Sequence, residues 1–427
     1  MTFNIYTLGC KVNTYESNVM SDLLKNKGYK EVSTNDKADI SIINTCTVTN
    51  TADRKSFKTI RHAIKQNENS IIVVVGCMSQ NKKDEVLKVD GVNIVLGNIG
   101  KSKVVEYIDE YIKTKNKKLD IFDMMDATFE PMILNNFNKT RAFIKIQDGC
   151  NNYCAFCIIP YVRGNVRSKD KELVLKEANN LIENGHKEIV LTGIHTGHYG
   201  SDLDNYTFSD LLTELCKIKG LERLRISSIE ITELDDNFLN VLNNNKTLVD
   251  HMHIPLQSGS DSVLKRMNRK YDKKYFIDKI DKIRKIRPLI SITTDVIVGF
   301  PGETEEEFNE TIETIKKIKF TKLHVFPYSR REGTVADSMD NQIDEKTKHE
   351  RVKILMNLSI ELEKEYMNKF INKEVVFIPE VYKDGYLIGH TGNYLQVKVK
   401  ENKDLLGKDV KIKLLKVEYP YVIGSVK

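Results

Sequence analysis

The chain has 427 residues, of which 40% are apolar and 30% are charged, and it carries a net charge of +6. This composition is typical of a soluble protein of two or three domains, and the modest charge is weak evidence for an acidic partner. The sequence has neither the roughly 18–20 consecutive apolar residues of a membrane-spanning helix nor the pattern of a signal peptide, so we expect a cytoplasmic protein with no membrane partner.

The first part of the chain, residues 1–115, alternates short apolar runs with amphipathic segments. Helices are predicted at residues 15–27 and 51–65, and strands at residues 3–8, 40–44, 71–76 and 92–96. This alternation predicts βαβ units and a parallel sheet in an α/β sandwich. The stretch that follows, residues 116–138, is polar and irregular, and we predict a linker there.

The alternation resumes between residues 139 and 365. Six strands are predicted, at residues 141–147, 188–191, 223–227, 251–255, 292–298 and 322–326, and a charged helix follows at residues 344–368. Six βα units predict an incomplete (β/α)6 barrel, a fold in which reactive groups collect at the carboxyl ends of the strands. Cys216 lies on the apolar side of a helix in this part of the chain and is interpreted as core packing.

The last part, residues 366–427, consists of short strand-like runs separated by turns, which predicts a small all-β barrel. It contains eleven Lys, no Arg and seven Asp or Glu, a net charge of +4. Four of the lysines alternate with apolar residues and would line one face of the strands: Lys398, Lys400, Lys411 and Lys413. Such a face can hold phosphate or be merely solvated.

Cys150, Cys154 and Cys157 form a C-x3-C-x2-C cluster. Three thiolates within eight residues can hold an iron–sulfur cluster of four irons and leave one iron open for chemistry. A structural zinc ion would need four ligands, usually in paired spacings, and no fourth Cys or His lies near in the sequence. Zinc and a chance grouping of cysteines are the alternatives.

A second set of cysteines consists of Cys10, Cys46 and Cys77, each at the end of a predicted strand and spaced 36 and 31 residues apart. These spacings match one βαβ step, and carboxyl ends of parallel strands share one edge of the sheet, so the three thiols are predicted to converge. Gly9 and Gly76 would let the backbone turn closely around a bulky cluster. The alternative is three buried core cysteines.

Four motifs together resemble the methylthiotransferase family of radical SAM enzymes over essentially the whole chain. They are Thr7-Leu-Gly-Cys-Lys-Val-Asn13, Asn44-Thr-Cys-Thr-Val-Thr-Asn50, Val75-Gly-Cys-Met-Ser-Gln80 and Cys154-Ala-Phe-Cys-Ile-Ile-Pro-Tyr-Val-Arg-Gly164. The resemblance implies an N-terminal methylthiotransferase domain (1–115), a linker (116–138), a radical SAM domain (139–365) and a TRAM domain (366–427). Gly9-Cys-Lys-Val-Asn13 is most similar to the subfamily acting on threonylcarbamoyladenosine in tRNA, since the isopentenyladenosine enzymes usually have Gly-Cys-Gln-Met-Asn.

The resemblance also implies two 4Fe-4S clusters and S-adenosylmethionine (SAM) as cofactors. The cluster on Cys150, Cys154 and Cys157 would cleave SAM to a 5′-deoxyadenosyl radical, which takes hydrogen from carbon 2 of an adenine next to the anticodon. The cluster on Cys10, Cys46 and Cys77 would carry or donate sulfur, and a second SAM would supply the methyl group. The implied partners are a tRNA anticodon stem-loop, an external one-electron donor and a sulfur source. Nothing in the sequence demands a dimer, and we expect a monomer.

By the same analogy, SAM contacts are expected at strand ends of the second domain, with an ordinary structural role as the alternative at each position: Phe156, Thr192, Gly193, Ser227, Glu230, Gln257, Asp295 and Gly299. Arginines after the cluster loop could meet the SAM carboxylate or tRNA phosphate, namely Arg163 and Arg167, with Arg330 and Arg331 as similar cases. Candidates for stacking on tRNA bases are Tyr382, Tyr386 and Tyr394. No role is assigned to His195, His198, His251 and His253.

Two alternatives fit the same residues, one in the same reaction class and one in a different class. One is a related methylthiotransferase that acts on isopentenyladenosine or on an aspartate of a ribosomal protein, which mass spectrometry of nucleosides and peptides would distinguish. The other is a non-catalytic RNA-binding iron–sulfur protein, which would not cleave SAM after reconstitution and reduction.

Overall fold

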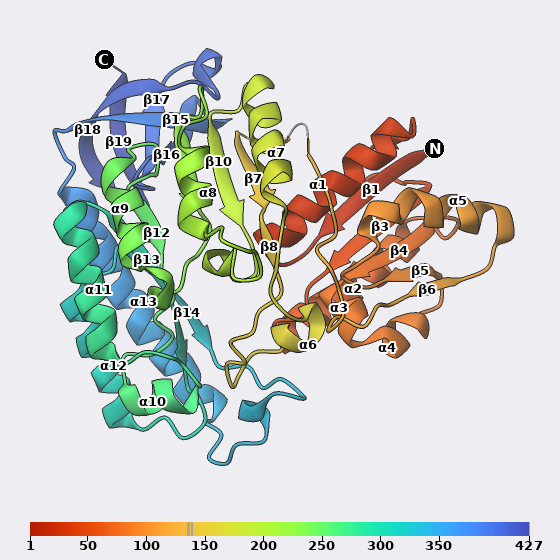
Figure 1. The fold of residues 1–427 in the computed structure, drawn as a ribbon, viewed down its shortest axis with the longest axis horizontal. Coiled ribbons are helices and arrows are strands. Elements are labelled where there is room, and N and C mark those ends of the chain that lie inside the picture. Colours follow the sequence, from red (N-terminus) through yellow and green to blue (C-terminus); the bar gives the residue numbers. More distant parts are fainter. Residues whose placement is uncertain (135–136, 138–139, 427) are drawn as a thin grey trace.

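The computed structural model describes residues 1–134, 137 and 140–426. Figure 1 shows a lobe built on the N-terminal sheet, a central curved set of strands covered by helices, and a small C-terminal barrel packed on one end of the central part. Two of the predicted domain limits, after residue 138 and at residue 427, fall outside the described residues.

The N-terminal lobe is a six-stranded parallel sheet in the order β2-β1-β3-β4-β5-β6. The strands β3 and β4 are buried at every residue because helices cover both faces of the sheet. The strands are β1 (Thr2–Thr7), β2 (Lys30–Glu31), β3 (Ile40–Thr45), β4 (Ile71–Gly76), β5 (Val92–Leu96) and β6 (Lys118–Asp120). The helices are α1 (Lys11–Asn26), α2 (Asn50–Gln66), α3 (Cys77–Asn81), α4 (Lys83–Leu87) and α5 (Val104–Thr114).

The segment predicted to be a linker is packed against both neighbours. Its strand β6 extends the N-terminal sheet, and the Glu130 carboxylate accepts a hydrogen bond of 2.8 Å from the backbone N–H of Ser102. Met132, Leu134 and Phe137 are buried in the core of the central part. The polar composition of this stretch therefore hides three apolar anchors that join the two parts of the molecule.

The central part is the predicted incomplete barrel, formed by two parallel three-stranded sheets, β7-β10-β11 and β12-β13-β14. A single parallel bridge between Leu224 and Leu248 joins the two sheets into one arc. The strands are β7 (Arg141–Lys145), β10 (Glu188–Thr192), β11 (Arg223–Ile226), β12 (His251–His253), β13 (Ser291–Val298) and β14 (Lys322–Pro327). All six strands predicted from the sequence are present.

Helices cover the outer face of this arc, as Figure 1 shows. They are α7 (Lys171–Glu183), α8 (Phe208–Leu215), α9 (Asp236–Asn244), α10 (Asp261–Arg266), α11 (Lys273–Ile286), α12 (Glu305–Ile318) and α13 (Glu345–Asn368). One loop carries Cys150, Cys154 and Cys157. It runs from the short strand β8 (Gln147–Asp148) to the helix α6 (Ile159–Arg163) and is not part of the six-stranded arc. The short strand β9 (Arg167–Ser168) follows α6. This connection places the cluster loop beside the carboxyl ends of the barrel strands.

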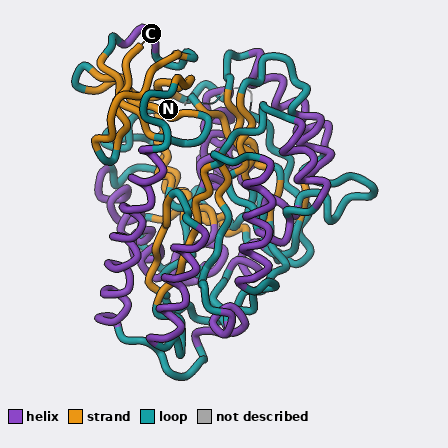
Figure 2. The backbone as a smooth tube through the Cα atoms, turned by 90° about the vertical axis from the view of Figure 1, so that its left-hand side faces the viewer, coloured by secondary structure: helices purple, strands orange, loops and turns teal. Residues whose placement is uncertain are grey.

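The C-terminal part is a closed barrel in the order β15-β16-β17-β19-β18, visible at the top of Figure 2. Its strands are β15 (Glu374–Lys383), β16 (Tyr386–Thr391), β17 (Gln396–Lys400), β18 (Val410–Glu418) and β19 (Tyr421–Val426). It rests on the starts of the central strands, where Arg223 donates 3.1 Å to the carbonyl of Val376 and Lys187 forms an ion pair of 2.8 Å with Asp409. The small barrel therefore closes the amino-terminal end of the larger one.

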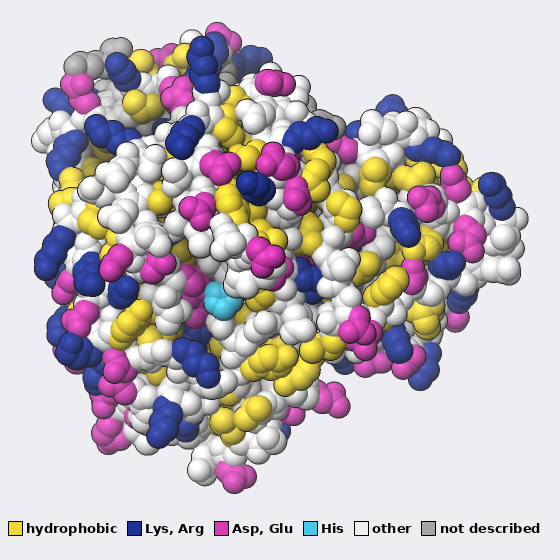
Figure 3. Space-filling model, viewed as in Figure 1, with side chains coloured by type: hydrophobic (Ala, Val, Ile, Leu, Met, Phe, Trp, Pro, Cys, Tyr) yellow, Lys and Arg dark blue, Asp and Glu magenta, His cyan; other side chains and the backbone are white. Residues whose placement is uncertain are grey.

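The face of the molecule in Figure 3 shows no single dominant charge. On this face, Lys and Arg side chains are interspersed with Asp and Glu over all three parts of the molecule. Among the described residues, no helix combines the length and the apolar character that crossing a membrane requires.

Candidate active site

The first set of cysteines lies at one edge of the N-terminal sheet. Cys10 follows β1, Cys46 follows β3 and Cys77 opens α3 directly after β4, and these three strands are neighbours in the sheet. Gly9 has a φ of +97°, and a Cβ atom at this position would lie 2.7 Å from Cys46 Cβ. Burial, with smaller contributions from the nearby sulfurs of Cys77 and Cys10, raises the pKa of the Cys46 thiol to about 11. The three thiols are thus brought into one neighbourhood.

Replacing Gly9 with Ala should damage this neighbourhood specifically. The new methyl group would collide with Cys46 in a backbone conformation that alanine disfavours. We expect iron in the reconstituted protein to fall by about four atoms per chain, while SAM cleavage at the other cysteine set persists. Gly28→Ala is the matched control, because Gly28 has a similar φ of +90° and open space around its Cα. Equal iron loss in both variants would attribute the effect to backbone strain alone.

The second set of cysteines is held by bonds to the barrel. The Arg269 guanidinium donates a hydrogen bond of 3.2 Å to Cys154 Sγ, and Nδ1 of His195 lies 3.6 Å from Cys150 Sγ. Within the loop, the Cys157 N–H donates 2.9 Å to the carbonyl of Cys154. Burial raises the pKa of the Cys154 thiol, and the Arg269 guanidinium offsets part of this rise in favour of the thiolate, the form that binds iron.

Both of these basic groups are themselves anchored by carboxylates. Arg269 donates 2.6 Å to Glu230, and His195 is ion-paired with Glu233. Burial lowers the pKa of His195, but its contacts with Cys150 and Glu233 outweigh burial and raise the pKa to about 10. The imidazolium therefore persists at neutral pH and faces the thiol with a positive charge.

The donor sets fit clusters better than single ions. Four sulfurs around one zinc ion lie about 3.8 Å from one another, as follows from a Zn–S distance of about 2.3 Å in a tetrahedron. In the part of the chain that the structure describes, the one group of three His, Cys, Asp or Glu ligand atoms within 4.8 Å of each other is His195, His198 and Glu233, with no cysteine in it. Three thiols spaced more widely match a multi-iron cluster.

A cavity of about 590 Å³, here called the cluster cavity, lies between the N-terminal lobe and the barrel. It is lined by one cysteine of the first set, Cys10, and by all three of the second set. It also brings together seven of the eight residues predicted to contact SAM: Phe156, Thr192, Gly193, Ser227, Glu230, Gln257 and Asp295. Thiols and polar groups at strand ends thus face the same cluster cavity.

The eighth residue, Gly299, does not line this cavity. It has a φ of +69°, packs against Lys348, and its N–H donates 2.5 Å to Glu303. Glu303 in turn is ion-paired with Arg351 of α13 at 2.7 Å. Gly299 therefore serves the turn that joins β13 to α12, and the expected SAM contact is not supported.

The predicted contact of Arg163 and Arg167 with SAM or tRNA is also not supported. Arg163 is fully buried, and its guanidinium contacts Asp148 at 3.1 Å and Glu16 at 3.2 Å. Its Nε donates 3.2 Å to the sulfur of Cys77. Arg167 is buried beside it and donates 2.8 Å to the Arg163 carbonyl. Neither guanidinium is open to a phosphate; Arg163 instead connects the cluster loop of the barrel to the first cysteine set.

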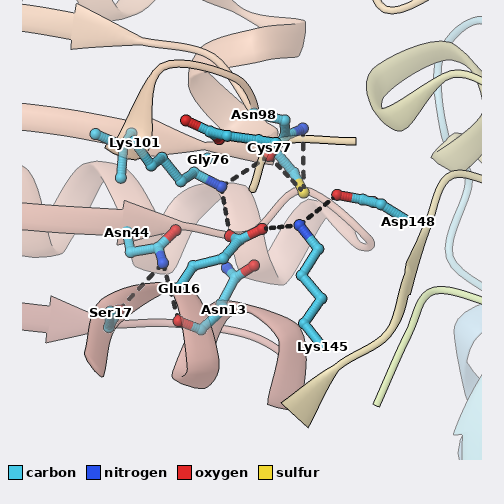
Figure 4. Close-up of polar contacts among 12 residues, drawn as sticks. Asn13, Glu16, Ser17, Asn44, Gly76, Cys77, Asn98, Lys101, Lys145 and Asp148 are labelled. Atoms are coloured by element: carbon cyan, nitrogen blue, oxygen red, sulfur yellow. Dashed lines mark hydrogen bonds and ion pairs between the residues drawn. The ribbon is translucent and has the colours of Figure 1, made fainter. Parts of the chain in front are cut away.

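Arg163 belongs to a buried network of charges beneath the first cysteine set. In Figure 4, Glu16 lies between the ammonium groups of Lys101 and Lys145, and Lys145 also reaches Asp148 at 2.6 Å. All of these side chains are almost completely removed from solvent. Burial alone would raise the pKa of Glu16, but Lys101, Lys145 and Arg163 outweigh it and hold this pKa far below its ordinary value.

Arg331 makes a second link between the lobe and the barrel. It is 3% exposed and donates 2.7 Å to Asp53 of α2, so it too is a structural group rather than a surface contact for tRNA. Arg330, in contrast, is exposed and pairs with Asp337 at 3.0 Å.

The lysines predicted to hold tRNA lie on outward positions of the C-terminal barrel, alternating with buried residues of β17 and β18. Lys398 lies over the ring of Tyr386, with 4.1 Å between Nζ and the ring centroid. Tyr382 and Tyr394 are both partly exposed, but Tyr394 faces the central barrel and stacks between His251 and His390.

The charged groups around the cysteines were not predicted from the sequence. His195 and Arg269 follow barrel strands or helices at unremarkable positions, and Glu16 and Asp148 lie 6 and 2 residues from a cluster cysteine in the sequence. One feature of the sequence could have indicated them, namely acidic residues on otherwise apolar faces of a helix or strand. Buried carboxylates are rare unless they are paired, so such residues predict a buried cation nearby.

Comparison with known proteins identifies the two larger parts. The model of the radical SAM superfamily matches residues 144–315, and that of uncharacterized protein family UPF0004 matches residues 2–97. Among solved structures, the radical S-adenosylmethionine methyltransferase TsrM from Kitasatospora setae is similar in fold, with a TM-score of 0.58 over 79% of this chain and 76% of that chain at 12% identity.

Relatives with assigned names cover the whole chain. Threonylcarbamoyladenosine tRNA methylthiotransferase MtaB from Bacillus subtilis is 47% identical over 99% of this chain and 96% of its own length. The MtaB protein of Aquifex aeolicus is 39% identical over 95% and 98% of the two chains. The tRNA-2-methylthio-N(6)-dimethylallyladenosine synthase of Clostridium tetani is 36% identical over 97% and 94%. The chain therefore belongs to the radical SAM tRNA methylthiotransferase family, as its cysteine motifs predicted.

Proposed function

We propose that the protein adds a methylthio group to carbon 2 of threonylcarbamoyladenosine beside the anticodon of tRNA, with two 4Fe-4S clusters. The observation that carries this proposal is the cluster cavity, because Cys10 of the first set and all three cysteines of the second set line it. One reaction that adds both sulfur and a methyl group needs both sets near the same substrate atom. The 47% identity to the MtaB protein of Bacillus subtilis supports the choice of substrate.

The chain's own residues would bind, orient and shield the reactants. Cys150, Cys154 and Cys157 would hold the cluster that, together with bound SAM, supplies a radical able to remove hydrogen from carbon 2. Arg269 and His195 would hold two of these thiols in position. Thr192, Ser227 and Asp295 offer hydroxyl and carboxylate groups to the polar parts of SAM.

Cys10, Cys46 and Cys77 would hold the second cluster, close enough to pass sulfur to the same adenine. The position of the cavity between two parts of the chain would limit the access of water to reactive species. Lys398, Lys400, Lys411 and Lys413 would grip tRNA phosphates from the C-terminal barrel, with Tyr382 and Tyr386 nearby for base stacking. An external one-electron donor and a sulfur source complete the proposed reaction.

Mass spectrometry of nucleosides from total tRNA, with and without the gene, tests the substrate. Loss of 2-methylthio-threonylcarbamoyladenosine together with accumulation of its unthiolated precursor is the expected result. If the isopentenyl derivative is lost instead, the chemistry is as proposed but the substrate is the other tRNA nucleoside. That nucleoside corresponds to the product in the name of the relative from Clostridium tetani. Unchanged tRNA would overturn the proposal and direct attention to ribosomal protein peptides.

A further inference from the structure

A second cavity of about 680 Å³ fills the inside of the central barrel, and it is here called the barrel cavity. It shares five lining residues with the cluster cavity: Gly9, Lys11, Ser227, His253 and Asp295. The two cavities are therefore continuous at the carboxyl ends of the strands. Tyr394 and His390 of the C-terminal barrel line the opposite end. A group attached to a substrate in the cluster cavity can thus extend into the barrel cavity.

The walls of the barrel cavity carry more positive than negative charge. Lys322 is bound by Glu363 at 3.1 Å, and the other carboxylate of the lining, Asp295, lies 3.2 Å from His253. The remaining charged side chains that line it are Lys11, Arg141 and Arg225. Behind the wall, Glu188 is shared between Arg225 at 2.8 Å and Arg223 at 3.5 Å, and Glu380 binds Arg141 at 3.0 Å. One carboxylate for two guanidinium groups leaves a surplus of positive charge.

Arg225 also has an unused hydrogen-bond donor. Its side chain is 3% exposed, its Nε donates to Glu188, and its Nη2 donates 3.3 Å to the carbonyl of Gly392. Its Nη1 is buried and has no hydrogen-bond partner among the described residues. The guanidinium is held in place by the ring of Tyr394, 4.9 Å from Cζ to the centroid. A buried donor without a partner costs free energy, and a ligand that accepts its hydrogen bond removes that cost.

Lys11 stands at the junction of the two cavities and forms no ion pair with any described residue. The surrounding walls and the guanidinium groups of Arg141 and Arg225 lower the pKa of its ammonium to about 8. Together with Val12, Lys11 distinguishes the motif Gly9-Cys-Lys-Val-Asn13 from the Gly-Cys-Gln-Met-Asn of the isopentenyladenosine enzymes. Its position next to Cys10 places it where a substrate would pass from one cavity into the other.

The depth of Arg225 matches the reach of one substrate group. Arg225 lies in β11 two residues before Ser227, which follows the strand and also lines the cavity, so Arg225 lies about 7 Å deeper than Ser227. A threonylcarbamoyl group is a carbamoyl unit followed by one amino acid, which spans about 6 Å when extended. It ends in a carboxylate, whereas a dimethylallyl group is apolar. An adenine held at the strand ends could therefore bring this carboxylate to Arg225.

We propose that Arg225, with Lys11 and Arg141, forms a carboxylate-binding subsite in the barrel cavity that selects the threonylcarbamoyl group of the substrate. This inference rests on the proposed function, since it names how that substrate is told apart from others. A neutral or apolar substituent would leave the Arg225 donor unpaired, and a buried polar site rejects analogues that cannot bond to it. Selection thus comes from both attraction of the acid and rejection of the alternatives.

The test compares binding of three anticodon stem-loop RNAs to the reconstituted full chain. They carry threonylcarbamoyladenosine, its methyl ester or unmodified adenosine at the same position. We expect the acid to bind about 10- to 100-fold more tightly than the ester, as one charge-assisted hydrogen bond in a buried site allows. In Arg225→Met this ratio should fall below about threefold, while binding of the unmodified RNA stays the same. Arg225→Lys should recover part of the preference.

Two further variants keep the test decisive if Arg225→Met folds poorly. Lys11→Met removes a charge without an ion pair to disturb, and we expect it to reduce the acid-to-ester ratio by about threefold or more. Arg287→Met is the matched control, because it removes a partly buried arginine of the same barrel that pairs with Asp250 and lines neither cavity. Its ratio should equal that of the wild type.

The outcomes separate the subsite from the proposed function. Equal binding of acid and ester by the wild type, or a full preference in both Arg225→Met and Lys11→Met, would overturn the subsite. If threonylcarbamoyladenosine is still converted in cells in that case, the proposed function survives. If this nucleoside is not converted and the two RNAs bind equally, both fall together.

Discussion

Replacing Cys46 with Ala should abolish methylthiolation of tRNA and leave cleavage of SAM intact. Cys46 belongs to the set at the edge of the N-terminal sheet, whereas the cluster that serves SAM lies on the loop after β8. Loss of one of three ligands should lower product formation by at least about 100-fold, since even loss of groups that only support metal ligands costs 10- to 100-fold. Cys154→Ala should abolish both SAM cleavage and methylthiolation. Assays of 5′-deoxyadenosine and of modified nucleoside on the same samples check this contrast.

Cys216→Ala is the matched control for both variants. Cys216 caps α8, packs against the barrel core and lines neither cavity. We expect its iron content and both activities to equal those of the wild type. Methylthiolation by Cys46→Ala would show that the second cluster is dispensable. Loss of SAM cleavage in the same variant would show that the two sites do not act independently.

The second large effect is expected from Glu16→Gln. Glu16 is fully buried and contacts Lys101, Lys145 and Arg163. Without its charge, Lys101 has no acidic partner among the described residues, and Lys145 and Arg163 share Asp148 with Arg167. Breaking a buried charge pair in this way costs about 3–5 kcal/mol. Anaerobic thermal unfolding of the reconstituted protein should show the midpoint lowered by about 5 °C or more. Glu85→Gln, which removes an exposed partner of Lys82, should leave the midpoint nearly unchanged.

The same variant should change the response to acid. The pKa of Glu16 in the folded chain is far below its unfolded value of about 4.3, so its stabilisation is fully present above that pH and is lost as the pH falls toward the folded pKa. The difference in unfolding midpoint between wild type and Glu16→Gln should therefore be constant above about pH 5 and shrink below it. Cluster-free protein serves for this series, because acid releases iron. A difference that does not depend on pH would show that lost packing, not lost charge, destabilises the variant.

The cysteine sets could be located from the sequence because their geometry follows from chain order. Cys10, Cys46 and Cys77 each follow a strand of a parallel sheet, and such strands end at a common edge. The same rule predicted most of the SAM candidates, which stand at the ends of barrel strands. Two short polar strands, β2 and β6, escaped prediction because Lys30–Glu31 and Lys118–Asp120 have no apolar alternation.

The partners of charged residues could not be predicted in this way. Arg163 follows a cysteine motif and has the sequence context of a surface arginine, yet its acid Glu16 comes from a helix 147 residues earlier. Gly299 has the sequence context of a ligand-binding turn, but its neighbours Glu303 and Arg351 use it as a tight corner. Such pairings depend on how separate parts of the chain pack together, and a local sequence pattern does not predict that packing.

Tyr394 has a consequence for how this enzyme can be altered. It belongs to the small C-terminal barrel, but with His390 it forms the floor of a chamber whose walls belong to the central barrel. If the barrel cavity holds the substituent of the modified base as proposed, the part of the chain expected to hold tRNA also shapes that space. It is not an interchangeable module: exchanging this barrel for another RNA-binding domain would open the chamber from below, so affinity for tRNA and choice of base must evolve together.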